Sequence, residues 1–258
     1  MNIDMPAGSG DRWPEDYERG RPGYPAGVVD IPGLTSASTV LDVGAGTGKL
    51  TRLLLARFGR VVAVEPAEAM RRLLAAGCPD AEVLAGSAEE IPLADGSVDA
   101  VFAAESFHWF DGARALTEIA RVLRPEGALV LMWNLPAGPV EPSIAEVERF
   151  VEARMPDREE LGHDPLDLNS TRYASGEWRL PFARSSFEEL RDARIPNPQT
   201  LDREGFVAFL ASMGWIADLA DAERLPLLDG IRSRLGADEY RRRWETHVCW
   251  TRQRCARS

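Results

Sequence analysis

The feature that most constrains the fold of this chain is a short apolar run that leads into a glycine-spaced loop. Thr39–Val43 is followed by Gly44, Gly46 and Gly48, and apolar residues then recur with a helical period over Lys49–Phe58. A short apolar run that stops at glycines is typical of a buried parallel strand. The segment therefore predicts a strand, a tight turn and a helix, in that order.

The same alternation continues along the next eighty residues. Helices are expected at Glu68–Ala76 and Ala113–Leu123, and further strands at Arg60–Val64, Glu82–Ala85, Ser97–Ala104 and Ala128–Trp133. Strands that alternate with helices of about ten residues indicate an α/β fold with a mostly parallel sheet. Because crossovers between parallel strands are right-handed, we expect a Rossmann-like, doubly wound sheet.

The pattern changes after Asn134. Met155–Phe182 has no clear period and is expected to be irregular, and Glu239–Trp250 is expected to be an antiparallel last strand. Helices are expected at Ser143–Arg154, Asp202–Met213 and Asp221–Leu235, with a strand at Ser186–Ile195. We therefore predict a Rossmann-like domain over residues 39–258, with a helical cap inserted at about 135–236. Residues 1–38, rich in glycine, proline and charge, form a separate N-terminal segment.

The glycine loop has a use in ligand binding. Glycines let the backbone turn sharply and let a ligand approach closely, and the following helix N-terminus suits a carboxylate or phosphate. Glu65 closes the second expected strand, where a carboxylate can accept both hydroxyls of a ribose. The two features together predict an adenosyl cofactor. The dinucleotide fingerprint spaces its glycines as G-x-G-x-x-G, so the spacing here argues against NAD.

Several segments resemble the class I methyltransferases that depend on S-adenosylmethionine. Asp42–Gly48 resembles their motif I, and Glu65-Pro66 resembles the acid that binds the ribose. The segment Gly86–Leu93, followed by Asp95–Asp99, is similar to the adenine-side loop and the fourth strand of these enzymes. The segment Glu118–Gly127 is similar to the helix and turn before their fifth strand.

Two more segments resemble one branch of that family. Glu105–Asp111 is similar to the A-x-x-F-H-W-F segment of methyltransferase type 11 proteins, which include trans-aconitate methyltransferase-like enzymes. Tyr17–Pro25 resembles the Y-x-R-x-R-P-x-Y-P start of the same branch, so the resemblance covers about residues 15–135. The chain departs from the pattern at Ser87, where many relatives have aspartate, and at Glu105, where many have glutamine.

The resemblance implies S-adenosylmethionine as cofactor and S-adenosylhomocysteine as product. It also implies that residues 1–38 act as a lid over the cofactor. The residues that we assign to cofactor binding on this basis are Tyr17, Arg21, Asp42, Gly44, Ala45, Gly46, Gly48, Glu65, Pro66, Met70, Ser87, Ala88, Glu89, Glu105 and Phe107. For Tyr17 and Arg21 the alternative is a solvated arm, and for Met70 it is a place in the core.

Methyl transfer needs a general base only when the acceptor is protonated at the working pH. His108, His163 and Glu105 are the catalytic candidates. His108 can act as the base, or it can form an aromatic wall over the adenosine with Phe107, Trp109 and Phe110. His163 lies in the irregular segment, where a cap can bring it over the methyl group or leave it on a surface loop. His247, in an expected strand, is interpreted as structural.

Composition limits the classes of partner. The 258 residues carry a formal net charge of -11, which argues against a nucleic-acid partner. The three cysteines, Cys78, Cys249 and Cys255, form no C-x-x-C, so neither a metal site nor a disulfide framework is predicted. We see no apolar run that could span a bilayer and no signal peptide at the start, so a cytoplasmic protein is expected.

The sequence thus predicts a transferase that methylates a small-molecule substrate at oxygen, nitrogen or carbon, in secondary metabolism for example. The alternative is a methyltransferase-fold enzyme that uses the cofactor for elimination, cyclisation or another group transfer, because fold does not fix function. A non-catalytic subunit is disfavoured, since it has no physical need for both the glycine loop and Glu65.

Overall fold

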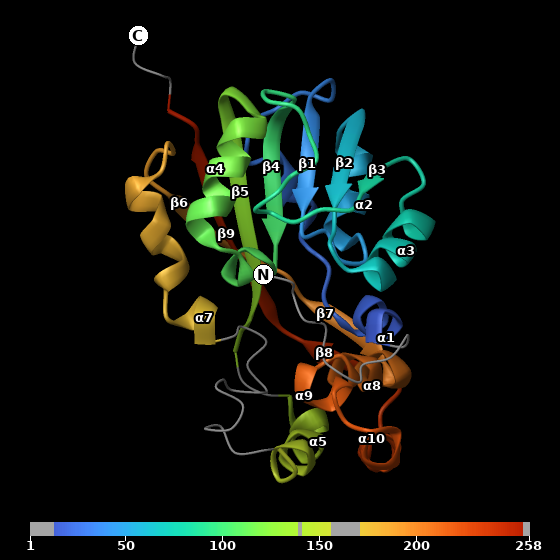
Figure 1. Ribbon diagram of the computed structural model, residues 1–258. Helices are drawn as coiled ribbons and strands as arrows, with labels where there is room; N and C mark the ends of the chain where they lie inside the picture. Colours follow the sequence, from blue (N-terminus) through green and yellow to red (C-terminus); the bar gives the residue numbers. More distant parts are fainter. Residues whose placement is uncertain (1–12, 139–140, 156–170, 255–258) are drawn as a thin grey trace.

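The computed structural model describes residues 13–138, 141–155 and 171–254. Its main sheet has the strand order β3-β2-β1-β4-β5-β9-β6 (Figure 1). The strands are β1 (Thr39–Val43), β2 (Arg60–Val64), β3 (Glu82–Leu84), β4 (Val98–Ala104), β5 (Leu123–Pro136), β6 (Arg191–Pro196) and β9 (Trp244–Arg252). Strands β1 to β5 pair in parallel, whereas β9 runs antiparallel to both β5 and β6. The expected Rossmann-like sheet with an antiparallel last strand is confirmed.

Helices cover both faces of the sheet. Helix α2 (Lys49–Arg57) buries Leu50 and Leu54 in one core cluster, together with the 3-10 helix η2 (Ala26–Asp30). Helix α4 (Gly112–Val122) buries its apolar stripe in the cluster on the opposite face. Helix α3 (Glu68–Gly77) packs against β2 in a smaller cluster. The sheet is therefore doubly wound, as the alternation of elements predicts.

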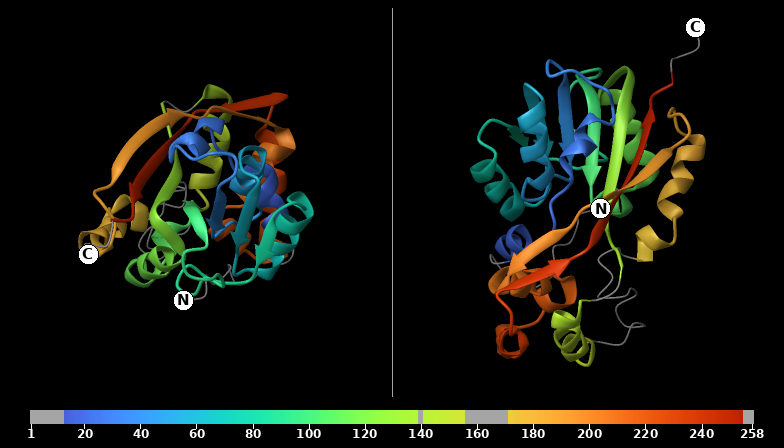
Figure 2. Two further views of the ribbon diagram at one scale, coloured as in Figure 1. Left: turned by 90° about the horizontal axis from the view of Figure 1, so that it is seen from above. Right: turned by 180° about the vertical axis from the view of Figure 1, so that it is seen from behind.

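A second body of structure lies beyond the carboxyl ends of β1, β2 and β4 (Figure 1). It contains α1 (Trp13–Gly20), α5 (Pro142–Glu152), α8 (Arg203–Ala211), α9 (Gly214–Ala217), α10 (Asp221–Arg234) and a small sheet of β7 (Gln199–Asp202) with β8 (Glu239–Arg242). Most of these elements share one hydrophobic cluster, and α1 packs on α8. We call this body the helical layer. Long strands connect the two bodies: β6 leads into β7, and β8 leads into β9 (Figure 2).

The segment Met155–Phe182, expected to be irregular, contains two short helices within its described part. These are α7 (Thr171–Ala174) and the 3-10 helix η4 (Glu177–Arg184). Trp178 and Phe182 stand one turn apart and bury against Phe107, whose ring centroid lies 6.3 Å and 5.5 Å from theirs. Within residues 171–182 the expectation was wrong, because this packing, rather than a long helical period, orders the two short helices.

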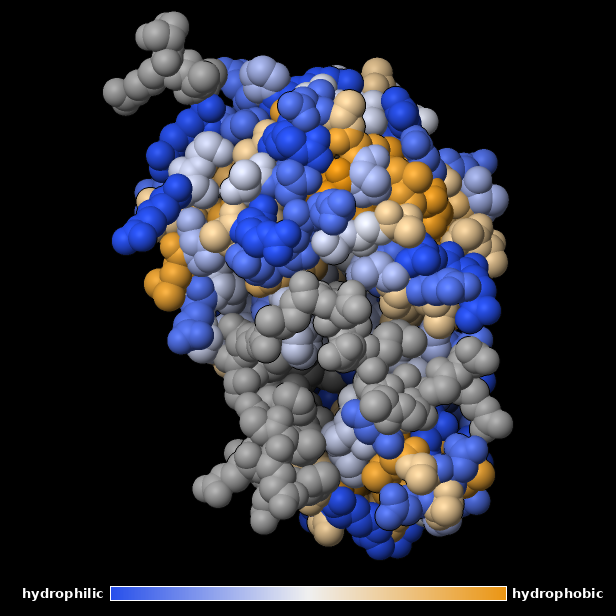
Figure 3. All heavy atoms as spheres, viewed as in Figure 1, coloured by the Kyte–Doolittle hydropathy of each residue, from blue (hydrophilic) through white to orange (hydrophobic). Residues whose placement is uncertain are grey.

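The strand β5 is longer than the six residues expected. It pairs with β9 along Ala128–Pro136, and Leu123 pairs with Val98 across a register shift. On the face shown in Figure 3, hydrophilic residues cover much of the described surface, and hydrophobic residues gather toward its upper right. Within the described part of the chain, no helix is long and apolar enough to cross a membrane.

Candidate cofactor-binding site

The glycine loop joins β1 to α2 at the carboxyl edge of the sheet. Gly44, Gly46 and Gly48 have φ values of +67°, +57° and +90°, which side chains rarely adopt. At Gly48, a Cβ atom would lie 2.7 Å from Leu74 Cδ1 and 2.9 Å from Cys78 Sγ. The loop backbone therefore needs glycine both for its conformation and for its close contact with α3.

Glu65 holds this loop from the end of β2. Its Oε2 accepts a hydrogen bond from Gly46 N at 2.9 Å, and its Oε1 accepts one from Ala67 N at 2.9 Å. Burial raises the pKa of Glu65, and the two backbone bonds oppose that shift. Each carboxylate oxygen has a second lone pair, so the side chain can hold the loop and still accept from a ligand hydroxyl.

Asp42 is a buried carboxylate below the same loop. Its Oδ2 accepts from Thr51 Oγ1 at 2.6 Å, whereas its Oδ1 is buried and has no hydrogen-bond partner among the described residues. Burial raises the pKa of Asp42 to about 7. A buried, unpaired acceptor carries a desolvation cost that a cationic or N–H donor can remove.

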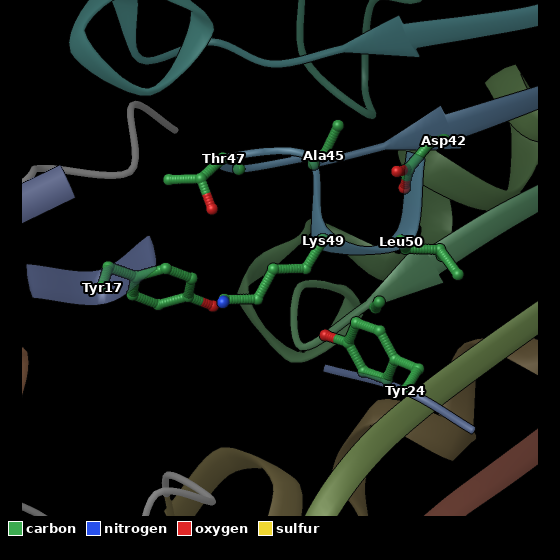
Figure 4. A pocket seen from close by; sticks show the side chains of 10 residues that line it. Tyr17, Tyr24, Asp42, Ala45, Thr47, Lys49 and Leu50 are labelled. Carbon is green, nitrogen blue, oxygen red and sulfur yellow. The ribbon is translucent and has the colours of Figure 1, made fainter. Parts of the chain in front are cut away.

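Two pockets share Gly44 as a lining residue. The first lies between α1, the glycine loop and the end of β4 (Figure 4). It is lined by Tyr17, Tyr24, Asp42, Gly44, Ala45, Gly46, Thr47, Lys49, Leu50 and Ala104.

The second pocket is formed by the loops that follow β2, β3 and β4. Its lining residues are Gly44, Pro66, Ser87, Ala88, Glu89, Trp109 and Phe110. Ser87 Oγ accepts a bond from Glu89 N at 3.3 Å, and Glu89 Oε1 accepts one from Asp111 N at 2.8 Å. The pocket thus has apolar and aromatic walls beside a fixed polar loop, which suits a flat heterocycle.

Glu18 fastens α1 to the start of α2, and we call its contacts the Glu18 latch. Its Oε2 accepts from Thr47 Oγ1 at 2.5 Å, and its Oε1 accepts from Arg52 Nη2 at 2.5 Å. Lys49 donates to the Glu18 carbonyl oxygen and lies 3.7 Å from Oε2. Sequence reasoning missed Glu18, Thr47 and Lys49, although Lys49 is the only lysine in the chain.

Tyr17 and Arg21, which were assigned together to the cofactor, point to different places. Tyr17 lines the first pocket, and burial raises its pKa to about 12. Arg21 instead donates from Nε to Ser212 Oγ and from Nη2 to Ser212 O, both at 2.8 Å. Arg21 therefore ties the end of α1 to the end of α8 within the helical layer. Tyr24, which belongs to the segment predicted to form the lid, also lines the first pocket.

Besides Arg21, five assigned residues line neither pocket: Gly48, Glu65, Met70, Glu105 and Phe107. Met70 is buried on α3, and Phe107 is buried among the rings of Phe110, Trp178 and Phe182. Of the aromatic residues expected to form a wall, Trp109 and Phe110 are the ones that line the second pocket.

Two of the three catalytic candidates, Glu105 and His108, lie just after β4. His108 is buried in η3 (Phe107–Trp109), and its Nδ1 accepts from Trp133 Nε1 at 2.9 Å. Because an indole nitrogen can only donate, the neutral imidazole must carry its proton on Nε2. Glu105 has a φ of +53°, and its Oε1 accepts from Asn134 N at 2.6 Å. His163 lies outside the described residues.

Comparison with known proteins identifies relatives in sequence. A family model described as Methyltransferase domain matches residues 41–131. A methyltransferase-like protein from Schizosaccharomyces pombe is 35% identical over 214 residues, which cover 81% of this chain and 78% of the relative. An uncharacterized methyltransferase from Mycobacterium tuberculosis is 55% identical over 118 residues, 46% of this chain. That match covers 49% of the mycobacterial protein, so the chain spans about half of its length.

Solved structures share the fold. A structure described as a type II methyltransferase from Anaeromyxobacter dehalogenans has a TM-score of 0.62 and 25% identity, covering 91% of this chain and 97% of that one. The phosphoethanolamine N-methyltransferase 2 of Haemonchus contortus, solved with phosphomonomethylethanolamine and S-adenosylhomocysteine, has a TM-score of 0.54 at 16% identity. That match covers 95% of this chain and 58% of the nematode chain, and it is a likeness of fold.

Proposed function

This chain belongs to the class I methyltransferases that use S-adenosylmethionine, and we propose that it methylates a small-molecule acceptor at oxygen, nitrogen or carbon. The observation that carries the proposal is the pair of pockets that share Gly44 as a lining residue. They lie at the carboxyl edge of the parallel strands, where open α/β sheets bind ligands. One elongated ligand can therefore occupy both pockets and cross the glycine loop.

The residues present fit the parts of this cofactor. The second pocket would take the adenine between Trp109, Phe110 and Pro66. Glu65, which holds the glycine loop from the end of β2, would accept from the ribose hydroxyls.

The first pocket would take the methionine end. Its unpaired Asp42 Oδ1 fits the ammonium group, while Lys49 and the start of α2 fit the carboxylate. The fit therefore extends to both charged groups of the amino-acid end.

The cofactor supplies, when bound, a methyl group activated by a positively charged sulfonium. The task of the protein is then to align the acceptor and to exclude water, which can supply roughly 7–11 kcal/mol of the barrier. Tyr17 and Tyr24 lie over the glycine loop and would shield the first pocket (Figure 4). The helical layer beyond the strand ends would act as the cap that selects the acceptor, with α1 as its lid.

A small acceptor is supported by two observations. The net charge of -11 disfavours binding to a phosphate backbone. The nematode neighbour, which shares the fold, holds the small molecule phosphomonomethylethanolamine. We therefore place small molecules, rather than nucleic acids, first in an acceptor screen.

The proposal is tested by calorimetric titration with S-adenosylmethionine, S-adenosylhomocysteine and NAD. We expect the first two to bind and Glu65→Ala to weaken S-adenosylhomocysteine binding by at least about tenfold, because each hydrogen bond to a charged group contributes about 1.5–3 kcal/mol. Glu68→Ala, on the exposed side of α3, is the matched control. Binding of NAD without S-adenosylmethionine contradicts the proposal. Release of S-adenosylhomocysteine with a methylated product distinguishes methyl transfer from elimination or cyclisation.

A further inference from the structure

The strand β6 forms one edge of the main sheet, and no other strand in the described part of the chain pairs with its outer side. Seen from above, it runs along the outside of the sheet (Figure 2). The side chains of Asp192 and Arg194 on this strand are 53% and 55% exposed. The opposite edge, β3, has three residues, whereas β6 has six. The longer edge offers more unpaired backbone groups to another chain.

The pairing of β6 with β9 shows which of its backbone groups face outward. Asn197 N donates to Trp244 O at 2.8 Å in the register of the β6–β9 pair, so Asn197 faces β9. Hydrogen-bonded and non-hydrogen-bonded pairs alternate in an antiparallel ladder, so the residues that face away from β9 are Asp192, Arg194 and Pro196. The position of Pro196 agrees with this orientation, because proline cannot donate to the ladder.

The outward-facing part of β6 is short. Glu188 N donates to Arg252 O at 2.9 Å, so Glu188 also faces β9, and the alternation must shift between Glu188 and the start of β6. At the other end, Pro196 has no N–H to offer. Within β6, Asp192 and Arg194 therefore present both an N–H and a C=O to the open edge. A bulge and a proline at its two ends restrict this edge to a short pairing.

This edge is complementary to itself. When a second copy of β6 lies antiparallel to the first with Ala193 on the two-fold axis, Asp192 of each copy stands opposite Arg194 of the other. Because both residues face outward, each such pair can exchange both of its backbone hydrogen bonds. The carboxylate and the guanidinium are then direct cross-strand neighbours, and opposite charges in that position stabilise a sheet.

The remaining side chains fit the same arrangement. Ala193 meets its own copy at the axis, where its small side chain lets the two strands approach. Successive side chains of a strand point to opposite faces, so Ala193, Arg191 and Ile195 lie on the face away from the two charges. Arg191 then stands opposite Ile195 of the second copy and meets no charge there.

The charges also select this register. Shifting the second copy by two residues in one direction places Asp192 opposite itself, and shifting it in the other direction places Arg194 opposite itself. Like charges directly opposite each other destabilise a sheet. A flat apolar edge would accept many strands, whereas this edge favours one partner in one register.

We propose that β6 pairs antiparallel with β6 of a second copy of this chain, about a two-fold axis at Ala193, so that one sheet runs through both copies. The same surface is used by both copies, so the pairing closes as a dimer and does not grow into a fibre. This inference is independent of the proposed function. Strands β5 and β9 separate β6 from β4, so the pairing leaves both cofactor pockets at the other side of the sheet.

The first test measures the dissociation constant of the full-length protein by sedimentation equilibrium. We expect a dimer whose population rises with concentration. Arg194→Asp places like charges opposite each other at both cross-strand positions and should raise the dissociation constant by at least about tenfold. Combining Asp192→Arg with Arg194→Asp exchanges the charges and should restore the dimer. Arg191→Asp makes the same change of charge on the other face of the strand and should leave the dissociation constant unchanged.

The second test traps the register. In a non-hydrogen-bonded pair the two Cα atoms lie about 4.5 Å apart, which a disulfide can bridge. Ala193→Cys, in a Cys255→Ser background, should therefore form a covalent dimer under mild oxidation. Arg191→Cys is the control and should stay monomeric on a denaturing gel, because residue 191 of the second copy lies on the far side of the two-fold axis.

The outcomes decide the proposal. A chain that is monomeric at every concentration, a dimer that Arg194→Asp does not weaken, or the absence of cross-linking in Ala193→Cys overturns it. Ala193→Cys keeps both charges, so it tests the register even where a charge variant fails to fold. Binding of S-adenosylhomocysteine should be unchanged in all variants. Failure of the wild type to bind it overturns the proposed function and leaves the pairing of β6 to be decided by the same measurements.

Discussion

The Glu18 latch predicts that the charge of the Glu18 carboxylate controls the opening of α1, which acts as a lid. Thr47 and Arg52 donate to the Glu18 carboxylate at 2.5 Å each, and Lys49 lies 3.7 Å from it. The Lys49 side chain is 14% exposed and that of Glu18 35%. Glu18→Gln keeps the shape and one acceptor oxygen but removes the charge. Hydrogen bonds to charged groups contribute about 1.5–3 kcal/mol when buried, and exposed ion pairs contribute up to about 1 kcal/mol.

For this half-buried latch we therefore expect a loss of about 1–2 kcal/mol. The population in which α1 has left the loop then rises by about 5–30-fold. Since Lys49 is the only lysine, acylation followed by peptide mass mapping reads this opening directly, with the α-amino group resolved as a separate peptide. We expect Lys49 to be acylated about 5–30-fold faster in Glu18→Gln. Saturating S-adenosylhomocysteine should slow the reaction in both proteins.

Two controls make the measurement decisive. Glu15→Gln removes the same charge from an exposed position of α1 and should leave the rate unchanged. Burial lowers the pKa of Lys49 and the Glu18 carboxylate opposes that shift, so loss of the carboxylate increases the fraction of free amine. Rates measured from pH 7 to 10 separate this change from opening. If wild-type Lys49 reacts as fast as a free lysine side chain, and Glu18→Gln does not change the rate, the latch does not hold α1 closed.

Three further predictions concern the loop, its buried acid and the nearby histidine. Burial holds the pKa of Asp42 at about 7 against an ordinary 3.8, so the native state binds a proton that the unfolded chain lacks between these values. The bound proton stabilises the native state fully below about pH 4, and the free energy of unfolding falls by up to about 4 kcal/mol as the pH rises to 7. In urea unfolding, Asp42→Asn should make the free energy of unfolding depend less on pH over this range. Gly48→Ala should lower stability by about 1–3 kcal/mol and impair S-adenosylhomocysteine binding, whereas Gly214→Ala, with open space around it, should do neither. Trp133→Phe should change the nitrogen NMR shift of His108 Nδ1, because it removes the indole donor to that atom; an unchanged shift contradicts the hydrogen bond.

The sequence by itself determined the frame of this protein. The run Thr39–Val43, the glycine spacing that follows and Glu65 are local patterns, and each is read within about twenty-five residues. Strand and helix periods depend on neighbouring residues, so the class I fold could be predicted from them. The carboxyl ends of consecutive parallel strands meet at one edge of the sheet, so the position of the site could be predicted as well.

Only the tertiary structure decided which side chains share the site. Arg21 contacts Ser212, 191 positions away, and Tyr173 contacts His247, 74 positions away. No periodicity or motif encodes such pairs, because they depend on how the helical layer and β9 return to the sheet.

Contacts between distant segments also explain why only some of the rings expected in the aromatic wall face the pocket. The spacing of Phe107, Trp109 and Phe110 showed that aromatic residues follow β4, but the burial of Phe107 against Trp178 decided which rings face the pocket. Local spacing determines which backbone positions carry aromatic side chains. Packing between distant segments determines where the functional atoms of those side chains lie.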